Sequence, residues 1–265
     1  MKKVASFCFL SSMLSLGAYS IFAQDAAPRR MQAGMTGNFA INMVKPTDSY
    51  FNSAPFNHDL SVGMILNTSF KNASNLGIST GFEFEFTKLN YEAADSVYYR
   101  YAGANILHQD EQGGTAYLLT DRQYSTVGVA IPFMMLFRMD PIGDWKIFAK
   151  FGIRNSFMVS QRINDRGFDV GADANGLTFT AKDNANLKSF GDQFFYKGSV
   201  GFSAGAEWNF AGSTSLVPEL GFYYGLTPLH FRAIDDNFTF SDASGTYFYQ
   251  KARQNQLIFK LSFLF

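Results

Sequence analysis

Charged residues that alternate with large apolar residues are the part of this chain whose types and spacing could do chemistry. Glu83 and Glu85 are separated by one phenylalanine in GFEFEF, and Lys150 and Arg154 are four residues apart in KIFAKFGIR. Alternate side chains of a strand point to the same face, so these acids and bases would project from one side of a sheet. Eight residues share the pattern: Glu83, Glu85, Lys150, Arg154, Lys197, Glu207, Glu219 and Lys260.

Four acids and four bases on one enclosed face could act in two ways. They could pair with one another, because ionised groups are costly to bury unless they are paired and hydrogen-bonded. They could instead line a gated path for ions along the same network. The width of the structure that encloses them decides between these alternatives.

The three histidines offer the chain's other chemistry. No two of His58, His108 and His230 have the spacing of metal ligands, and we expect them to be solvated in or beside loops. A catalytic histidine needs a nucleophile or an acidic partner. The local candidate is His230 with Asp235 and Asp236, and Ser241 lies further along the same loop. Nothing in the sequence fixes their geometry, so we expect no enzyme.

The segment GADANG matches part of a calcium-binding loop but not the whole loop pattern. Asp173 and Asn175 match the middle of such a loop, but its first position would be Gly171 and its twelfth Lys182, neither of which supplies a carboxylate. Nearby Asp165 and Asp169 are the remaining calcium candidates. No phosphate-binding glycine loop, cysteine/histidine cluster or nucleophile elbow is present. We expect neither a metal nor a cofactor.

The elements that position the eight charges are alternating segments with one apolar face. They are 34–44, 60–70, 76–88, 124–137, 145–156, 196–210, 215–226 and 257–265. Segments of about ten alternating residues are typical of strands that cross an outer membrane. The opposite phase would place lysines and arginines against lipid, at a cost of about 2–4 kcal/mol each near the midplane. The charges therefore face the lumen.

The connections between these segments alternate in length. KNASN, the region of DPIGD and AGSTS are short, whereas 44–59, 90–118, 159–193 and 228–248 are long and polar. The pattern predicts an all-β, antiparallel up-and-down transmembrane barrel of eight strands, with ten as the alternative if a loop hairpin joins the wall. The short turns would face the periplasm and the four long loops the exterior, three of them continuing as hairpins. Side chains fill so narrow a barrel, which favours an ion-paired core over an ion path.

The beginning of the sequence has the order of a secretory signal. Lys2 and Lys3 precede an apolar run that is too short to span a bilayer as a helix, and small residues follow up to Ala23. We expect a cleaved signal peptide at 1–23, a short disordered leader at 24–33 and the barrel domain at 34–265. Without Lys2 and Lys3, 20 basic residues stand against 22 acidic ones, a net charge of −2 that gives no footprint for nucleic acid.

The last segment, LIFKLSFLF, resembles the C-terminal assembly signal of bacterial outer-membrane proteins, which the barrel-insertion machinery reads. Its apolar face consists of Leu257, Phe259, Leu261, Phe263 and Phe265. With the strand pattern and the element VGVAIPFMMLF, the layout resembles the outer-membrane protein β-barrel domain family of small porin-like proteins. The resemblance implies the fold, an outer-membrane location and contact with lipid and the insertion machinery. It implies no catalytic residues, because that family shares none.

Aromatic residues fall into two groups. Trp145, Trp208, Phe210 and Tyr224 lie near predicted strand ends and are expected to form a membrane-interface girdle. Loop aromatics could anchor an extracellular ligand or pack the loops together; they are Tyr50, Phe51, Tyr98, Tyr99 and Tyr101.

The sequence as a whole predicts a non-enzymatic outer-membrane barrel with a plugged polar lumen and four extracellular loops in a structural or adhesive role. A narrow channel for small solutes is the alternative. A barrel enzyme that modifies lipid A or cleaves surface proteins is the remaining one.

Overall fold

The computed structural model describes residues 30–108, 111–174, 176–188, 192–211, 214–230 and 240–265. The expected signal peptide lies outside these residues. Among the described residues, no helix is both long and apolar enough to cross a membrane. Thirteen strands form one sheet. They are β1 (Met31–Pro46), β2 (Phe51–Ser53), β3 (His58–Phe70), β4 (Ala73–Ala102), β5 (Asn105–Ile106), β6 (Thr115–Arg138), β7 (Trp145–Asp173), β8 (Gly176–Leu187), β9 (Tyr196–Ala211), β10 (Thr214–Gly225), β11 (Phe240–Ser241), β12 (Tyr247–Phe248) and β13 (Ala252–Leu264).

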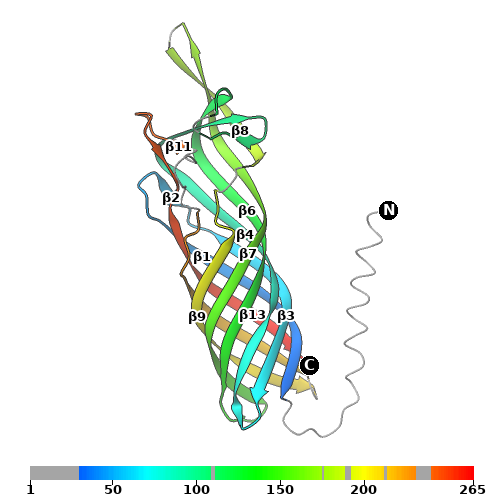
Figure 1. Cartoon of the computed structure of the whole chain (residues 1–265). Coiled ribbons are helices and arrows are strands. Elements are labelled where there is room, and N and C mark those ends of the chain that lie inside the picture. Colours follow the sequence, from blue (N-terminus) through cyan, green and yellow to red (C-terminus); the bar gives the residue numbers. More distant parts are fainter. Residues whose placement is uncertain (1–29, 109–110, 175, 189–191, 212–213, 231–239) are drawn as a thin grey trace, which may run out of the picture.

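Eight of these strands close into a ring. The order is β4-β3-β1-β13-β10-β9-β7-β6, and pairing of β6 with β4 completes the circle. All eight pairings are antiparallel. The eight-stranded barrel is thereby confirmed. The ten-stranded alternative is wrong, because the short strands and β8 pair off the ring (Figure 1).

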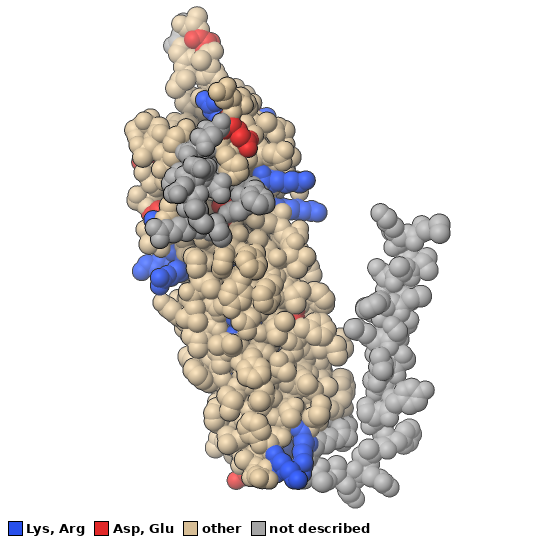
Figure 2. All heavy atoms as spheres, in the orientation of Figure 1, with Lys and Arg blue, Asp and Glu red and all other residues tan. Residues whose placement is uncertain are grey.

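Strand alternation gives the lower barrel an apolar outside and a polar inside. Outward side chains such as Phe151 and Phe202 are 58% and 61% exposed, whereas the inward neighbours Lys150 and Ser203 are 4% and 1% exposed. We call the outward set the apolar belt; it includes Met35, Met43, Leu60, Val62, Phe82, Phe84, Phe86, Val127, Ile131, Phe133, Phe151, Phe202, Leu220, Tyr224, Phe259, Leu261 and Phe263. Few charged side chains interrupt the middle of this surface (Figure 2).

Above the belt the wall strands continue, and the interior changes character. β4, β6 and β7 have 30, 24 and 29 residues, so much of the expected loops at 90–118 and 159–193 is strand. Inward positions of β4 change from Glu83 and Glu85 to Leu89 and Tyr91, all buried. In water the outer face of a sheet must be polar and its inner face apolar, which reverses the pattern required in lipid.

Both kinds of connection lie where the barrel topology requires. The short turns and the C-terminus share one end of the barrel, and the long extensions share the other (Figure 1). β1 begins at Met31, three residues before the boundary expected from the sequence, because residues 31–33 pair with Leu66, Asn67 and Thr68 of β3. Trp145 and Trp208 are opposite each other on β7 and β9, and their rings stack at 5.6 Å, close to the short turns. The side chain of Phe210 lies outside the described residues.

Candidate functional site: a polar lumen beneath an aromatic cap

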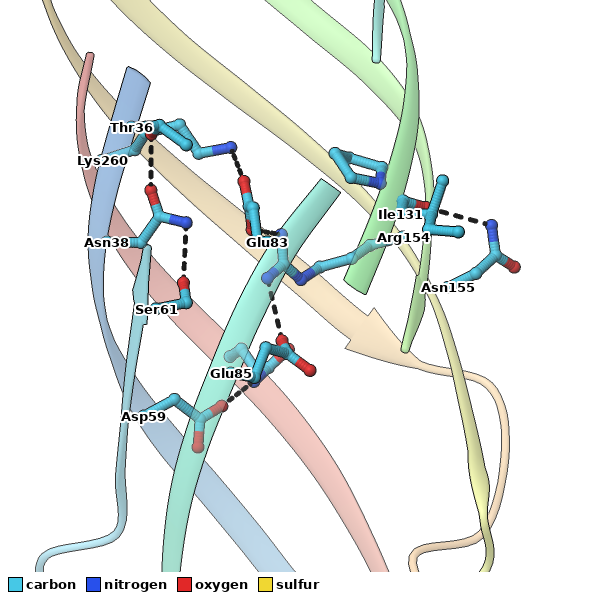
Figure 3. A network of polar contacts seen from close by, with 12 residues as sticks. Thr36, Asn38, Asp59, Ser61, Glu83, Glu85, Ile131, Arg154, Asn155 and Lys260 are labelled. Carbon is cyan, nitrogen blue, oxygen red and sulfur yellow. Dashed lines mark hydrogen bonds and ion pairs between the residues drawn. The ribbon is translucent and has the colours of Figure 1, made fainter. Parts of the chain in front are cut away.

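A chain of ion pairs crosses the lumen at the level of the belt. The Lys260 ammonium lies 2.7 Å from Glu83, whose other carboxylate oxygen lies 2.5 Å from the Arg154 guanidinium. Arg154 also donates to Glu85 at 2.8 Å. Figure 3 shows these side chains converging from β13, β4 and β7. All four are at most 7% exposed.

A second ion pair lies beside this chain. The Lys150 ammonium donates to Glu219 at 2.6 Å, and the hydroxyl of Ser203 donates to the other oxygen of the same carboxylate at 2.6 Å. Lys150 also lies 4.9 Å from the centre of the Phe148 ring, a cation–π distance. Together the two groups hold three acids and three bases, so the buried charge is balanced.

Two of the eight charged residues named from the sequence take no part in these direct ion pairs. Glu207 is at the short-turn end, 3.8 Å from Arg138 and within hydrogen-bond distance of Gln32. Lys197 is at the other end of the belt, where it lines a small pocket with Glu85 and Thr87. The described residues place no carboxylate in a salt bridge with Lys197. The structure therefore brings six of the eight together.

Neutral polar side chains extend the lumen network and were not named from the sequence. Asn42 donates to Asp59 at 2.7 Å, and Gln254 and Gln256 donate to the Asn42 carbonyl at 2.6 and 3.0 Å. Gln256 also reaches Asp59 at 2.6 Å. Strand parity was a usable signal, because Gln254 and Gln256 alternate with outward residues in phase with Lys260.

An apolar cluster lies inside the lumen near the short-turn end. It combines inward side chains from five strands and consists of Ile65, Leu136, Phe148, Val217 and Leu264. All are at most 5% exposed. Within the described part of the chain, this cluster separates the Glu207–Arg138 pair at the end of the barrel from the ion pairs deeper in the lumen.

The opposite end carries a larger plug, which we call the aromatic cap. Its buried members come mainly from the extended strands and loops: Val44, Phe51, Leu89, Tyr91, Val97, Tyr99, Tyr101, Ile106, Tyr117, Leu119, Tyr124, Ile163, Leu187, Leu229, Phe240 and Ala252. Of the loop aromatics singled out in the sequence, Phe51, Tyr99 and Tyr101 are buried here, and Tyr50 packs against the cap. Tyr98 is half-buried. These residues pack the loops together.

A bidentate ion pair lies at the centre of the cap. Arg122 donates to Asp165 through Nε at 2.8 Å and Nη2 at 2.6 Å, and the Tyr99 hydroxyl donates to the same carboxylate at 2.7 Å. The guanidinium carbon lies 4.7 Å from the centre of the Phe240 ring. Burial alone would lower the pKa of Arg122, but the charge of Asp165 outweighs it and raises the pKa well above its ordinary value.

His230 belongs to the cap as well. We expected it to be solvated, but it is 3% exposed, so that prediction is wrong. Its Nε2 is 2.9 Å from the Tyr91 hydroxyl, and its Nδ1 lies 3.7 Å from the carboxylate of Asp192. Asp192 also accepts from Tyr124 at 2.7 Å. The segment that ends at His230 thus packs against Tyr91 and Tyr124, long-range contacts that the local sequence could not indicate.

Around His230 the described residues supply Tyr91, Tyr124 and Asp192. Its expected partners Asp235 and Asp236 lie outside the described residues, and Ser241 lies in β11. Burial raises the pKa of the Tyr124 hydroxyl, and the charge of Asp192 raises it further. Burial would raise the pKa of Asp192, but the hydrogen bond with His230 and the charge of Arg122 outweigh it and lower that pKa.

The calcium candidates have cationic partners. Asp165 binds Arg122, and Asp169 lies 3.1 Å from the Lys182 ammonium and accepts from the Tyr101 hydroxyl at 2.7 Å. The described residues of GADANG lie at the end of the β7–β8 hairpin, where Asp173 pairs with Gly176. No group of three or more His, Cys, Asp or Glu side chains in the described ranges could hold a metal ion.

Sequence comparison agrees with this architecture. Residues 22–230 match the family described as "Outer membrane protein beta-barrel domain". The chain belongs to this family. The outer-membrane location is therefore established, and the apolar belt is its lipid-facing surface. No curated protein sequence matches the chain.

Solved structures of other barrels resemble this one only distantly. Ail of Yersinia pestis, solved in complex with the heparin analogue sucrose octasulfate, is 11% identical, with 89% of this chain and 100% of Ail covered and a TM-score of 0.34. Neisserial surface protein A is 9% identical, with 89% and 98% covered and a TM-score of 0.29.

Proposed function

We propose that this protein is a non-enzymatic outer-membrane barrel whose closed lumen supports an extracellular binding structure. The observation that carries the proposal is that buried side chains occupy the lumen at three levels: the apolar cluster around Phe148, the ion pairs around Glu83 and Arg154, and the aromatic cap around Arg122. A narrow barrel filled by its own side chains serves as a rigid anchor.

Conductance measurement distinguishes the anchor from a narrow solute channel. Purified barrel inserted into a planar bilayer should give no steady ohmic steps, because each level of closure excludes hydrated ions. Steady steps of one size that persist in the wild-type protein would support the channel instead. A variant with a shortened cap is unsuitable as the sole test, since two further levels remain closed.

We assign binding to the exposed hairpin of β7 and β8. Beyond the cap this hairpin projects furthest from the barrel (Figure 1). Leu177 and Phe179 are 67% and 49% exposed, and Phe179 pairs with Val170 on the same face. The opposite face carries Thr178 and Thr180. An apolar face held in water at the end of a rigid barrel is a suitable surface for a partner.

A pull-down from intact cells tests this assignment with matched variants. Leu177→Ser with Phe179→Ser removes the apolar face, whereas Thr178→Ala with Thr180→Ala changes the opposite face of the same strand. The partner should be retained by wild type and by the threonine variant and lost from the serine variant. Equal retention by both variants would overturn the hairpin as the binding surface.

Catalysis is tested separately at the buried histidine. His230→Ala should leave lipid A structure and surface-protein processing unchanged in cells. A loss of either modification, with folding of the barrel intact, would replace the binding proposal with an enzymatic one.

A further inference from the structure

Two cations lie close together on the outer wall of the barrel. Lys88 of β4 and Arg162 of β7 are both exposed. Neither takes part in a salt bridge among the described residues. This contrasts with the lumen, where six charged groups form compact ion pairs.

The two cations lie in one row across three neighbouring strands. Lys88 is opposite Ser125 of β6, and Ser125 is opposite Arg162. Inward neighbours confirm that the row faces outward, because Leu89, Tyr124 and Ile163 are all buried. At about 4.8 Å between strands, the backbones of Lys88 and Arg162 are about 10 Å apart, with the serine hydroxyl between them. Long, flexible cations on either side of a hydroxyl can converge on one anion.

The row lies at the edge of the apolar belt. Phe86 and Val127 are two residues away on β4 and β6 and are 50% and 38% exposed. Two residues of strand span about 7 Å. This is about the distance over which a bilayer changes from its hydrocarbon core to its headgroup region. Lys and Arg side chains gather beyond the uncharged middle of the barrel in Figure 2.

The neighbouring rows supply no anion to neutralise these cations. On the cap side the adjacent outward residues are Asn90 and Gln123, which hydrogen-bond to each other at 2.8 Å. On the lipid side they are Phe86 and Val127. A second exposed pair, Lys45 opposite Arg253, lies near Asp48, whose carboxylate accepts the backbone N–H of Lys251 at 2.8 Å. Of these two exposed pairs, the row of Lys88 is the one whose adjacent described positions hold no carboxylate.

We propose that Lys88, Ser125 and Arg162 form a binding site for the phosphate of an outer-membrane lipid headgroup. Arginine binds phosphate through paired N–H groups, lysine adds a point charge, and a serine hydroxyl donates one further hydrogen bond. The position at the edge of the belt selects a lipid, since the acyl chains of the same molecule would lie along the exposed phenylalanines. The site depends on the barrel's place in the membrane and not on what the hairpin binds.

Native mass spectrometry of the detergent-released barrel tests the site with lipid A as the probe. Wild type should retain diphosphoryl lipid A, and Lys88→Gln with Arg162→Gln should bind it at least tenfold more weakly. The matched control is Lys71→Gln with Arg30→Gln, which removes the same two residue types at the other end of the barrel and should bind like wild type. Dephosphorylated lipid A should bind all three proteins equally weakly.

Two outcomes would overturn the proposal. Equal affinity of wild type and the Lys88/Arg162 variant for diphosphoryl lipid A would exclude the site. Displacement of the lipid by millimolar inorganic phosphate, with phosphate alone bound by wild type and not by the variant, would assign the site to free phosphate and overturn the lipid assignment. Unheated gel migration confirms that each variant is a folded barrel before binding is measured.

Discussion

Arg122 and Asp165 form a two-point ion pair in the aromatic cap, and neither side chain is exposed to solvent. They are 43 residues apart in the sequence and lie on the adjacent strands β6 and β7. Removing one partner of a buried pair leaves the other charge uncompensated, whereas replacing both by apolar groups of similar size is often tolerated. The cap is therefore vulnerable to single substitutions at this pair.

The first prediction concerns that vulnerability. Arg122→Met should lower the free energy of opening the cap by about 3–5 kcal/mol, because Asp165 would remain buried among aromatic rings without its cationic partner. Hydrogen exchange of the upper β4 and β6 amides measures this free energy locally. Arg122→Met combined with Asp165→Leu should recover part of the loss. An unchanged exchange rate in the single variant would show that the pair does not stabilise the cap.

A second prediction follows from the lowered pKa of Asp192. A carboxyl whose pKa is lower in the folded cap than in the open chain, where it is about 3.9, stabilises the cap above that value. This contribution is lost as pH falls through the folded pKa. Protease cleavage within the cap should therefore accelerate below about pH 4 in wild type. In Asp192→Asn, cleavage should be faster at pH 7 and less dependent on acid; a variant with the wild-type profile would exclude Asp192 as the group.

The third prediction concerns the orientation of the barrel in the membrane. The single cysteine of the sequence, Cys8, lies in the expected signal peptide, so introduced cysteines can be labelled selectively. Cysteines introduced at Asn105 and Asp242, in the cap end of the barrel, should react with a membrane-impermeant reagent on intact cells. A cysteine at Ser74, beside the turn between β3 and β4, should react only after the outer membrane is permeabilised. Labelling of the Ser74 position on intact cells would reverse the orientation.

The barrel could be read from the sequence because lipid and lumen impose opposite requirements on alternate residues. Glu83 and Glu85 between Phe82, Phe84 and Phe86 allow only one phase, and the structure has that phase. The order of the wall strands is then simple. Wall strands that follow one another in the sequence are neighbours in the ring, and pairing of β13 with β1 closes it.

The cap could not be read in the same way. Above the belt no lipid constrains the outer face, and the partners of Arg122, Asp192 and His230 come from segments that only the closed barrel brings together. Tyr91 and His230, for example, are 139 residues apart in the sequence, and the Tyr91 hydroxyl lies 2.9 Å from His230 Nε2. Alternation does reveal that Leu89 and Tyr91 continue the inward face of Glu85, but it does not say which loops will cover them.

The final prediction tests whether the apolar face of β13 directs assembly. Phe263 is 45% exposed on the belt, and its neighbour Ser262 is fully buried with its hydroxyl 3.0 Å from Thr36. Phe263→Lys should reduce the yield of folded barrel in cells by more than its energetic cost implies. That cost is at most about 2–4 kcal/mol at the midplane and less towards the interface. Phe263→Leu keeps the face apolar and is the control for loss of the aromatic ring alone. Ser262→Leu should leave targeting intact and affect only local packing, since it changes the lumen side.

Gel migration of unheated and heated samples measures the folded fraction, and refolding of purified Phe263→Lys in detergent separates stability from assembly. If Phe263→Lys gives normal yields in cells, the insertion machinery does not read this face. If it fails equally in cells and in detergent, the defect is one of stability, and the prediction that this face directs assembly fails for Phe263.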